Sequence, residues 1–160
     1  MVVFKQRSVL TGITVSQAMS REVCRLGADA SLSDAIRHMT RSREDAVLLD
    51  ETDGLSAGVI SRTDLTGAFY SGLPLDTRAG DIMNPAVFCN PLDRIEEVIA
   101  LMGEQSFHRV YVREESGAVV GTISFTNIVG LLYRYCRTCV KSRRRADKIE
   151  EDGLPRVRIK

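Results

Sequence analysis

Hydrophobic positions along the chain fall into blocks, and each block occurs twice in the same order. Residues 58–65, Gly-Val-Ile-Ser-Arg-Thr-Asp-Leu, match residues 121–128, Gly-Thr-Ile-Ser-Phe-Thr-Asn-Ile, at an offset of 63 positions. The apolar positions within 32–39 coincide with those within 95–102 at the same offset. Five matched blocks in register indicate an internal duplication, which constrains the whole fold. Residues 46–49 match 109–112 at the same offset. Ala18-Met19 matches Ile82-Met83 and Val23 matches Val87 at an offset of 64, so the first copy carries one extra residue.

The first half of each copy predicts a short strand followed by a helix. β-Prone runs at Val23-Cys24 and at residues 86–88 come first. Apolar residues spaced three and four apart in 32–39 then predict an amphipathic helix, because this spacing places them on one helical face. Ser33-Asp34 and Asp93 stand at the predicted helix starts, where side-chain oxygens cap free N–H groups.

The second half of each copy predicts a hairpin and another helix. Apolar runs flank a turn at Asp53-Gly54 and again at Ser116-Gly117, the pattern of a β-hairpin. A further helix is expected after Ser61 and after Ser124. The predicted fold is therefore α/β, of the α+β kind, with the order β-α-β-β-α twice. Since a copy of about 60 residues buries little surface alone, we expect the two copies to pack together.

The segment from Gly58 to Asp64 carries the pattern Gly-apolar-apolar-Ser-x-x-Asp in full. It lies where a strand is expected to end and a helix to begin, and the free N–H groups at a helix N-terminus favour a phosphate. The Ser61 hydroxyl adds a donor, and Asp64, one turn later, can accept from both hydroxyls of a ribose. The alternative interpretation is that Ser61 caps the helix and Asp64 is a favourable first-turn acid.

Over residues 14–133 the chain resembles a tandem pair of CBS domains (cystathionine β-synthase domains), a Bateman module. The resemblance implies two repeats packed with pseudo-twofold symmetry and two clefts between them. Each cleft would bind an adenosine-containing regulatory ligand, namely AMP, ADP, ATP or S-adenosylmethionine, and no other cofactor is required. The matching features are Ala18-Met19, Ile82-Met83, the two Gly-x-x-Ser elements, the helix from Ile95 to Met102, and the run 108–112 leading into Ser116-Gly117.

For the first cleft, the resemblance implies a complete set of ligand contacts. Ser61 would contact the phosphate and Asp64 the ribose hydroxyls. Ala86 and Val87, from the other repeat, would line the adenine pocket. We therefore expect the first cleft to be the main binding site.

For the second cleft, the resemblance implies contacts from Ser124, Asn127 and Val23. Asn127 keeps one acceptor but loses the charge and the bidentate acceptance of an aspartate, so we expect this cleft to bind weakly or to stay empty. His108 and Arg109 open the second hairpin, where the family often carries a basic side chain that reaches phosphates. His108 fits equally well as a side chain that covers an edge of the sheet.

Beyond the second copy, apolar residues continue at helical spacing as far as Val140. They predict an extended C-terminal helix that packs on its own domain or on a second subunit. The apolar residues near the N-terminus would be its local partner. The expected division of the chain is an N-terminal segment at 1–13, repeats at 14–73 and 74–133, and a C-terminal helix with a basic tail at 134–160.

Two motifs in this tail each have two interpretations. Cys136 and Cys139 supply half of a tetrahedral zinc site, so they are either packing residues on a helix or half of a zinc site shared across a dimer; packing is preferred and no metal site is assigned. The basic run 141–145 suits either a solvated helix end or nucleic-acid phosphates. No aromatic residues alternate with its arginines, which disfavours single-strand binding.

The net charge of the chain conceals an acidic body and a basic tail. The chain has 160 residues and a net charge of +1, from 22 basic and 21 acidic side chains. Residues 1–133 hold 12 basic and 17 acidic side chains, a balance of −5, whereas 134–160 hold 10 and 4, a balance of +6. An anionic ligand of the acidic body must therefore rely on local N–H groups and on Arg109.

Composition also restricts the class of protein. No apolar run approaches the roughly 20 residues that span a bilayer, so membrane insertion is not expected. The four cysteines suggest reduced thiols, and no signal-peptide pattern is visible at the N-terminus, so a cytoplasmic location is expected.

No Ser-His-Asp set, paired catalytic carboxylates or Walker loop points to catalysis. The sequence thus predicts a non-enzymatic regulatory module that acts as a homodimer, through its CBS repeats and terminal helices, on an unidentified regulated protein. The alternatives are a nucleic-acid-binding regulator that uses the basic tail, and a structural dimerisation module with empty clefts.

Overall fold

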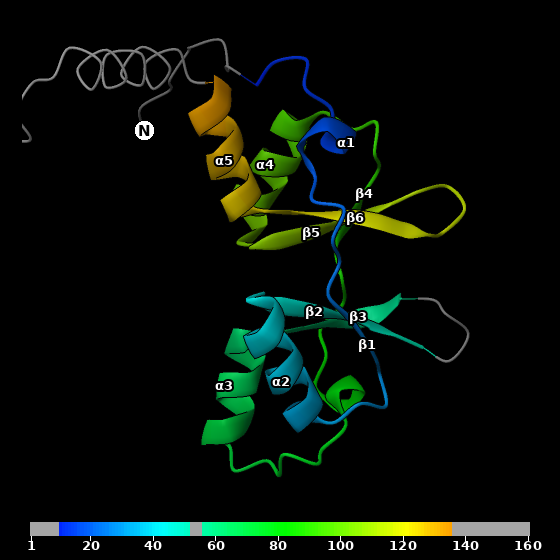
Figure 1. The fold of residues 1–160 in the computed structure, drawn as a ribbon, viewed down its shortest axis with the longest axis vertical. Helices are drawn as coiled ribbons and strands as arrows, with labels where there is room; N and C mark the ends of the chain where they lie inside the picture. Colours follow the sequence, from blue (N-terminus) through cyan, green and yellow to red (C-terminus); the bar gives the residue numbers. More distant parts are fainter. Residues whose placement is uncertain (1–9, 52–55, 136–160) are drawn as a thin grey trace, which may run out of the picture.

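The computed structural model describes residues 10–51 and 56–135, which form two repeats of the same architecture (Figure 1). In the first repeat the chain runs through a short helix, a strand, a helix, a hairpin and a helix. These elements are α1 (Val15–Ala18), β1 (Arg25–Gly27), α2 (Leu32–Ser42), β2 (Ala46–Asp50), β3 (Ser56–Ser61) and α3 (Arg62–Tyr70).

The second repeat has the same order, except that a 3-10 helix replaces the short first helix. Its elements are η1 (Ala79–Asp81), β4 (Phe88–Cys89), α4 (Ile95–Gln105), β5 (Arg109–Arg113), β6 (Val119–Ser124) and α5 (Phe125–Tyr135). The predicted order β-α-β-β-α, twice, is confirmed.

Each repeat contains a three-stranded sheet, with the orders β1-β2-β3 and β4-β5-β6. The first two strands of each sheet pair in parallel and the last two pair as the predicted antiparallel hairpin. Both hairpins shift register at the same place, between Leu49 and Asp50 and between Val112 and Arg113. These positions are related by the offset of 63, so the duplication extends to the irregularities of the sheets.

The two sheets face each other across the middle of the molecule, and the helices lie on their outer sides (Figure 1). Because side chains alternate across a strand, Val110 and Val112 of β5 enter the core under the helices. Tyr111 points to the opposite face, where it is buried with only 2% of its surface exposed. Leu48 of β2, at the equivalent position, is also fully buried and belongs to neither helix-side core. These two side chains therefore pack between the sheets.

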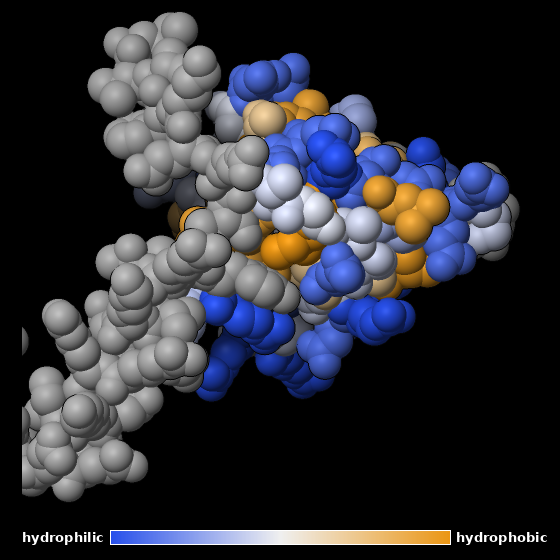
Figure 2. Space-filling view, turned by 90° about the horizontal axis from the view of Figure 1, so that it is seen from above, coloured by the Kyte–Doolittle hydropathy of each residue, from blue (hydrophilic) through white to orange (hydrophobic). Residues whose placement is uncertain are grey.

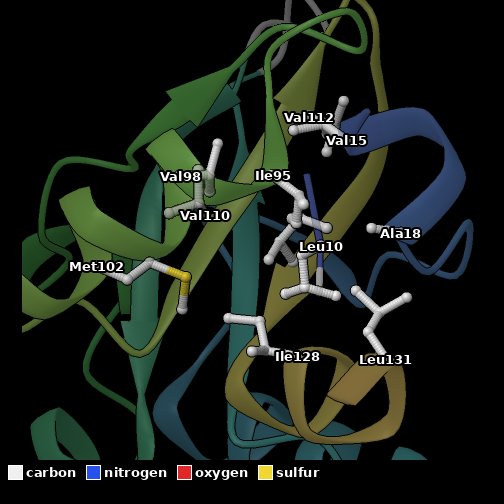
Figure 3. Packing of buried hydrophobic residues seen from close by; sticks show 11 residues of the cluster. Leu10, Val15, Ala18, Ile95, Val98, Met102, Val110, Val112, Ile128 and Leu131 are labelled. Atoms are coloured by element: carbon white, nitrogen blue, oxygen red, sulfur yellow. The ribbon is translucent and has the colours of Figure 1, made fainter. Parts of the chain in front are cut away.

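Each hydrophobic core is completed by the segment at the start of the other repeat. The first leading segment (residues 10–20) contributes Leu10, Val15 and Ala18 to the core of repeat 2 (Figure 3). The second leading segment (residues 79–87) contributes Ala79 to the core of repeat 1, with Ile82 and Met83 packed against it. The exchange is reciprocal, as a pseudo-twofold arrangement requires.

Backbone hydrogen bonds hold the leading segments in place. Ser20 and Thr122 exchange two N–H···O bonds of 2.9 Å, and Val59 and Asn84 do the same at 2.8 and 2.9 Å. The amide of Ile95 at the start of α4 donates to the carbonyl of Ile13 at 3.0 Å. A helix N-terminus leaves its first N–H groups unpaired within the helix, so here the leading segment supplies an acceptor.

The positions of the first strand in each repeat and of two helix caps were predicted wrongly. In the second repeat, β4 lies at Phe88–Cys89 and not at residues 86–88. The first strand lies at Arg25–Gly27, not at Val23-Cys24, because residues 20–24 carry the chain from its pairing with repeat 2 to the sheet of repeat 1. The cap of α2 is Ser31, whose Oγ accepts from the Asp34 amide at 3.1 Å, so Ser33 lies inside the helix.

The second wrong cap is Asp93. Its carboxylate accepts from the amide of Asn90 at 2.7 Å and closes the turn before α4, while Arg94 occupies the capping position.

Several predictions concern residues outside the described part of the chain. They are the extended helix beyond Tyr135, the cysteines Cys136 and Cys139, the basic run 141–145, and the N-terminal residues 1–9. Among the helices within 10–51 and 56–135, none has the length and apolarity needed to cross a membrane.

Candidate functional site: two clefts between the repeats

The residues expected to form the first cleft lie at the start of α3, where Ser61 is the N-cap residue and Asp64 lies in the first turn. Asp64 Oδ2 accepts from the Ser61 amide at 2.7 Å and from Ser61 Oγ at 2.6 Å. The Asp64 amide donates back to Ser61 Oγ at 3.3 Å. The capping interpretation of this pair is therefore realised in the structure, in the form of a capping box.

Asn84 is a member of the first cleft that the sequence analysis missed. Its Nδ2 donates to Asp64 Oδ1 at 2.8 Å, from the second leading segment to α3. Each carboxylate oxygen has two acceptor sites, so Oδ2 of Asp64 is saturated by Ser61 while Oδ1 keeps one free site beside Asn84. Asn84 directly follows the duplicated Ile82-Met83 pair, and this position next to a repeat landmark is the signal that could have found it.

Close packing explains why the Gly-x-x-Ser element begins with glycine in both repeats. A Cβ on Gly58 would lie 2.6 Å from the carbonyl oxygen of Asn84, and one on Gly121 would lie 2.7 Å from that of Ser20. A methyl group cannot be accommodated at such distances from a backbone atom. The glycines therefore allow each leading segment to run directly against the strand that ends at the cleft.

Ala86 and Val87, expected to line the adenine pocket, are both half-buried. Val87 packs partly against the core of repeat 2, and its carbonyl accepts from the Tyr111 amide at 2.8 Å. They follow Asn84 on the same leading segment, and their contact with an adenine ring stays a prediction.

The second cleft is built around the start of α5 and contains a small cavity of about 170 Å³. Asn127 Oδ1 accepts from the Ser124 amide at 2.9 Å and from Ser124 Oγ at 2.8 Å. Both acceptor sites of this oxygen are used, so Asn127 has none left for a ribose hydroxyl. Val23 is half-buried and is not among the cavity-lining residues, which are Ser20, Arg43, Glu44, Asp45, Arg62, Arg109, Thr122, Ser124, Thr126 and Asn127.

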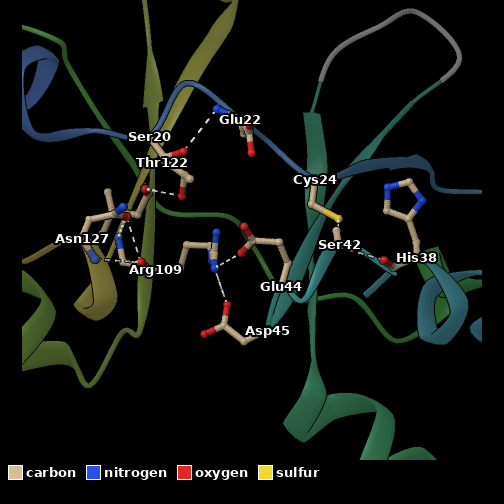
Figure 4. A network of polar contacts seen from close by, with 12 residues as sticks. Ser20, Glu22, Cys24, His38, Ser42, Glu44, Asp45, Arg109, Thr122 and Asn127 are labelled. Carbon is tan, nitrogen blue, oxygen red and sulfur yellow. Dashed lines mark hydrogen bonds and ion pairs between the residues drawn. The ribbon is translucent and has the colours of Figure 1, made fainter. Parts of the chain in front are cut away.

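Arg109 lies in the second cleft and is bound to carboxylates of the other repeat (Figure 4). Its Nη2 donates to Glu44 Oε2 at 2.5 Å and also to Asp45 Oδ1, and its Nε donates to Asp45 Oδ1 at 3.1 Å. Although burial acts to lower it, the pKa of this guanidinium is raised above its ordinary value because Asp45 and Glu44 stabilise the charge. The basic side chain predicted to reach a ligand phosphate is thus engaged by the protein itself.

His108 is exposed, and its ring lies edge-to-face against Phe125 with 5.9 Å between the ring centroids. His108 thus packs against the start of α5, beside β5, the middle strand of its sheet. Its contact with a ligand phosphate stays a prediction.

Tyr111 carries the one buried side-chain oxygen that lacks a hydrogen-bond partner within the described part of the chain. Burial raises the pKa of its hydroxyl, against the nearby charge of Arg109, which lowers it. The hydroxyl lies between the two sheets, a position that the sequence pattern does not reveal.

The described residues include no group of three or more His, Cys, Asp or Glu side chains arranged to hold a metal ion.

The fold and the sequence together define the class of this protein. The model of the CBS domain matches residues 15–71 and again residues 79–134. The chain therefore belongs to the CBS-domain family and consists, over most of its length, of a tandem CBS pair. A search of the curated proteins finds no match to the sequence.

Solved structures share this fold at low sequence identity. A CBS-domain protein from Pyrobaculum aerophilum in complex with AMP has a TM-score of 0.69 and 22% identity, covering 72% of this chain and 89% of that one. A CBS-domain protein from Agrobacterium tumefaciens has a TM-score of 0.68 and 24% identity, with coverages of 73% and 91%. The CBS pair of protein MJ0100, in complex with 5′-methylthioadenosine and S-adenosyl-L-methionine, has a TM-score of 0.68 and 17% identity, with coverages of 74% and 94%.

Proposed function

We propose that this chain is a non-catalytic regulatory module that binds an adenosine-containing ligand in the first cleft. The candidates are AMP, ADP, ATP and S-adenosylmethionine. The observation that carries the proposal is the Ser61–Asp64 pair at the start of α3, which faces Asn84 of the second leading segment. Related CBS structures in complex with AMP and with S-adenosyl-L-methionine support the ligand class.

The free acceptor site on Asp64 gives the first cleft its chemical role. A ribose hydroxyl can donate to Oδ1 beside the Asn84 amide. Asn127 has a single side-chain oxygen, which is saturated by Ser124, and an amide nitrogen that cannot accept takes the place of the second oxygen. The N-terminus of α3 also favours a phosphate by its orientation and partial charge. Ligand binding would regulate a partner by favouring one of two arrangements of the repeats or subunits, because a ligand shifts an equilibrium only through different affinities for its states.

A thermal-unfolding panel with AMP, ADP, ATP and S-adenosylmethionine tests this proposal. A ligand present at about 100 times its Kd adds about 2.7 kcal/mol of stability, so at least one should raise the Tm of the wild type by several degrees. Asp64→Ala should abolish that shift. The matched control is Asp34→Ala, which removes an equivalent capping box from α2 and should keep the shift.

The outcomes separate the alternatives. If no member of the panel raises the Tm of the wild type, the sensing role is wrong and a structural module with empty clefts is favoured. If Asp64→Ala retains the shift, the assignment of the first cleft is wrong.

We further propose that the module works as a homodimer through its outer helices. Phe69 and Tyr70 at the end of α3 are 73% and 82% exposed, and at the offset of 63 they correspond to Leu132 and Tyr133 of α5, which are also exposed. Exposed apolar side chains at equivalent positions of both repeats support one common contact surface. Figure 2, which views the molecule from the repeat-2 end, shows hydrophobic patches bordered by hydrophilic surface.

A groove of about 720 Å³ between α2 and α3 adds room for the side chains of a second copy. Its apolar lining includes Ile36, Met39 and Leu65. Phe69→Lys should shift the molecule toward the monomer in sedimentation analysis, because it places a charge in the apolar contact. Leu92→Lys, at an apolar residue that is 79% exposed elsewhere, is the control and should leave the mass unchanged. A monomeric wild type would contradict the proposal.

A further inference from the structure

The guanidinium of Arg109 is buried more deeply than the carboxylates that bind it. The Arg109 side chain is 9% exposed, and those of Glu44 and Asp45 are 31% and 42% exposed. The two carboxylates follow Arg43, whose left-handed backbone (φ 57°) ends α2 and turns the chain toward β2. A rotation of either carboxylate toward solvent would leave Arg109 in place inside the cleft.

The second cavity is lined by more basic than acidic side chains. Arg43, Arg62 and Arg109 line the cavity together with Glu44 and Asp45. The two carboxylates neutralise two of the three guanidinium charges. Guanidinium binds carboxylate and phosphate with the same planar donor geometry, so Arg109 cannot fully serve Glu44, Asp45 and a phosphate at once.

The first cleft lacks this arrangement. At the offset of 63, Glu44 and Asp45 correspond to Phe107 and His108, and Arg109 corresponds to Ala46. Ala46 lies opposite Ser61 in the β2–β3 pair, as Arg109 lies opposite Ser124 in the β5–β6 pair. The ion pairs are therefore specific to the cleft that also carries Asn127.

We propose that Glu44 and Asp45 form an acidic clamp that occupies the anion-binding side of the second cleft. A phosphate-bearing ligand binds there only by displacing the clamp from Arg109. Since the clamp joins α2–β2 of repeat 1 to β5 of repeat 2, such a ligand also removes an ionic link between the repeats. This inference rests on the proposed function, to which it adds a competitor that keeps the second cleft closed to anions.

Calorimetric titration with inorganic pyrophosphate tests the clamp without requiring an adenosine pocket. The double variant Glu44→Gln, Asp45→Asn keeps the side-chain shapes but removes both charges. It should bind pyrophosphate at least about tenfold more tightly than the wild type, which corresponds to about 1.4 kcal/mol. Adding Arg109→Gln to this variant should abolish the gain.

A second pair of adjacent acids provides the matched control. Glu114→Gln, Glu115→Gln makes the same change in net charge at exposed residues that follow the far end of β5, and it should leave pyrophosphate affinity near that of the wild type. The clamp is refuted if the control gains as much as the clamp variant, or if the gain survives without Arg109. If the double variant does not fold, Asp45→Asn alone should give a gain of about threefold, and no gain there would refute the clamp.

The titration tests the clamp whether the proposed function is right or wrong. Failure of every adenosine ligand to stabilise the wild type would refute the sensing role, while tighter pyrophosphate binding by the clamp variant would still establish the competition at Arg109.

Discussion

At the scale of single residues, the polar side chains between the repeats differ in whether they find hydrogen-bond partners. Arg109 has two carboxylate partners, and Asp64 has Ser61 and Asn84. The Tyr111 hydroxyl is buried without a partner in the described residues. A buried polar group that makes no hydrogen bond costs about 1–3 kcal/mol of stability, so this hydroxyl weakens the ligand-free fold while its ring stabilises it.

Substitutions of Tyr111 test whether its hydroxyl and its ring have opposite effects on stability. Tyr111→Phe removes only the hydroxyl and should raise the free energy of unfolding by about 1 kcal/mol. Tyr111→Ala also removes the ring, which packs against Phe88 with 6.3 Å between centroids, and should lower the free energy of unfolding by about 3–5 kcal/mol. Urea denaturation followed by circular dichroism measures both. A loss of stability in Tyr111→Phe would mean that the hydroxyl is satisfied in solution.

At the scale of elements, the strand β3 and the helix α3 each contain a glycine with a different role. Gly58 of β3 allows the second leading segment to run against the strand. Gly67 lies within α3, where an added Cβ meets no atom within 4 Å. The sequence motif marks the first glycine as part of Gly-x-x-Ser, but only the contact with Asn84 explains why a larger residue does not fit.

The two glycines provide a matched pair of substitutions. Gly58→Ala should destabilise the protein by about 1–3 kcal/mol, because the methyl group forces the strand and the leading segment apart. Gly67→Ala should stabilise it by up to about 1 kcal/mol, because alanine favours a helix over glycine. Thermal unfolding of both variants measures the difference. A tolerated Gly58→Ala would show that the leading segment is displaced easily.

The elements around the two clefts differ in how well the sequence predicts them. Both helix starts carry a serine cap and a residue that accepts from it three positions later. The Ser61 cap, the hairpins and the second helices were predictable, because each depends on residues within a few positions. The position of β1 was not, because residues 20–24 follow the surface of repeat 2 before they reach their own sheet.

At the scale of the whole molecule, the exchange of leading segments makes each repeat depend on the other. Val15 is fully buried in the core of repeat 2 although it lies at the start of repeat 1 in the sequence. Ala79 is equally buried in the core of repeat 1. Because each core contains a segment continuous with the other repeat, we expect the two repeats to unfold together.

A cavity-forming substitution in the first leading segment tests whether the two repeats unfold together. Val15→Ala should lower the free energy of unfolding by about 2 kcal/mol through lost burial and a residual cavity, while urea unfolding remains a single transition. Val129→Ala, at a residue of α5 that is 63% exposed, should change stability by no more than about 0.5 kcal/mol. Two separate transitions in Val15→Ala would show that the repeats are independent units.

The sequence by itself determined the duplication, the order of the elements, the hairpins and the Ser61–Asp64 pair, because these features are set by local spacing and by a repeat that can be read directly. Tertiary structure decided which residues meet across the clefts. Arg109 and its carboxylate partners lie 64 and 65 positions apart, and Asn84 lies 20 positions from Asp64. No local pattern specifies such pairs, because they arise only when the leading segments are exchanged and the two sheets pack face to face.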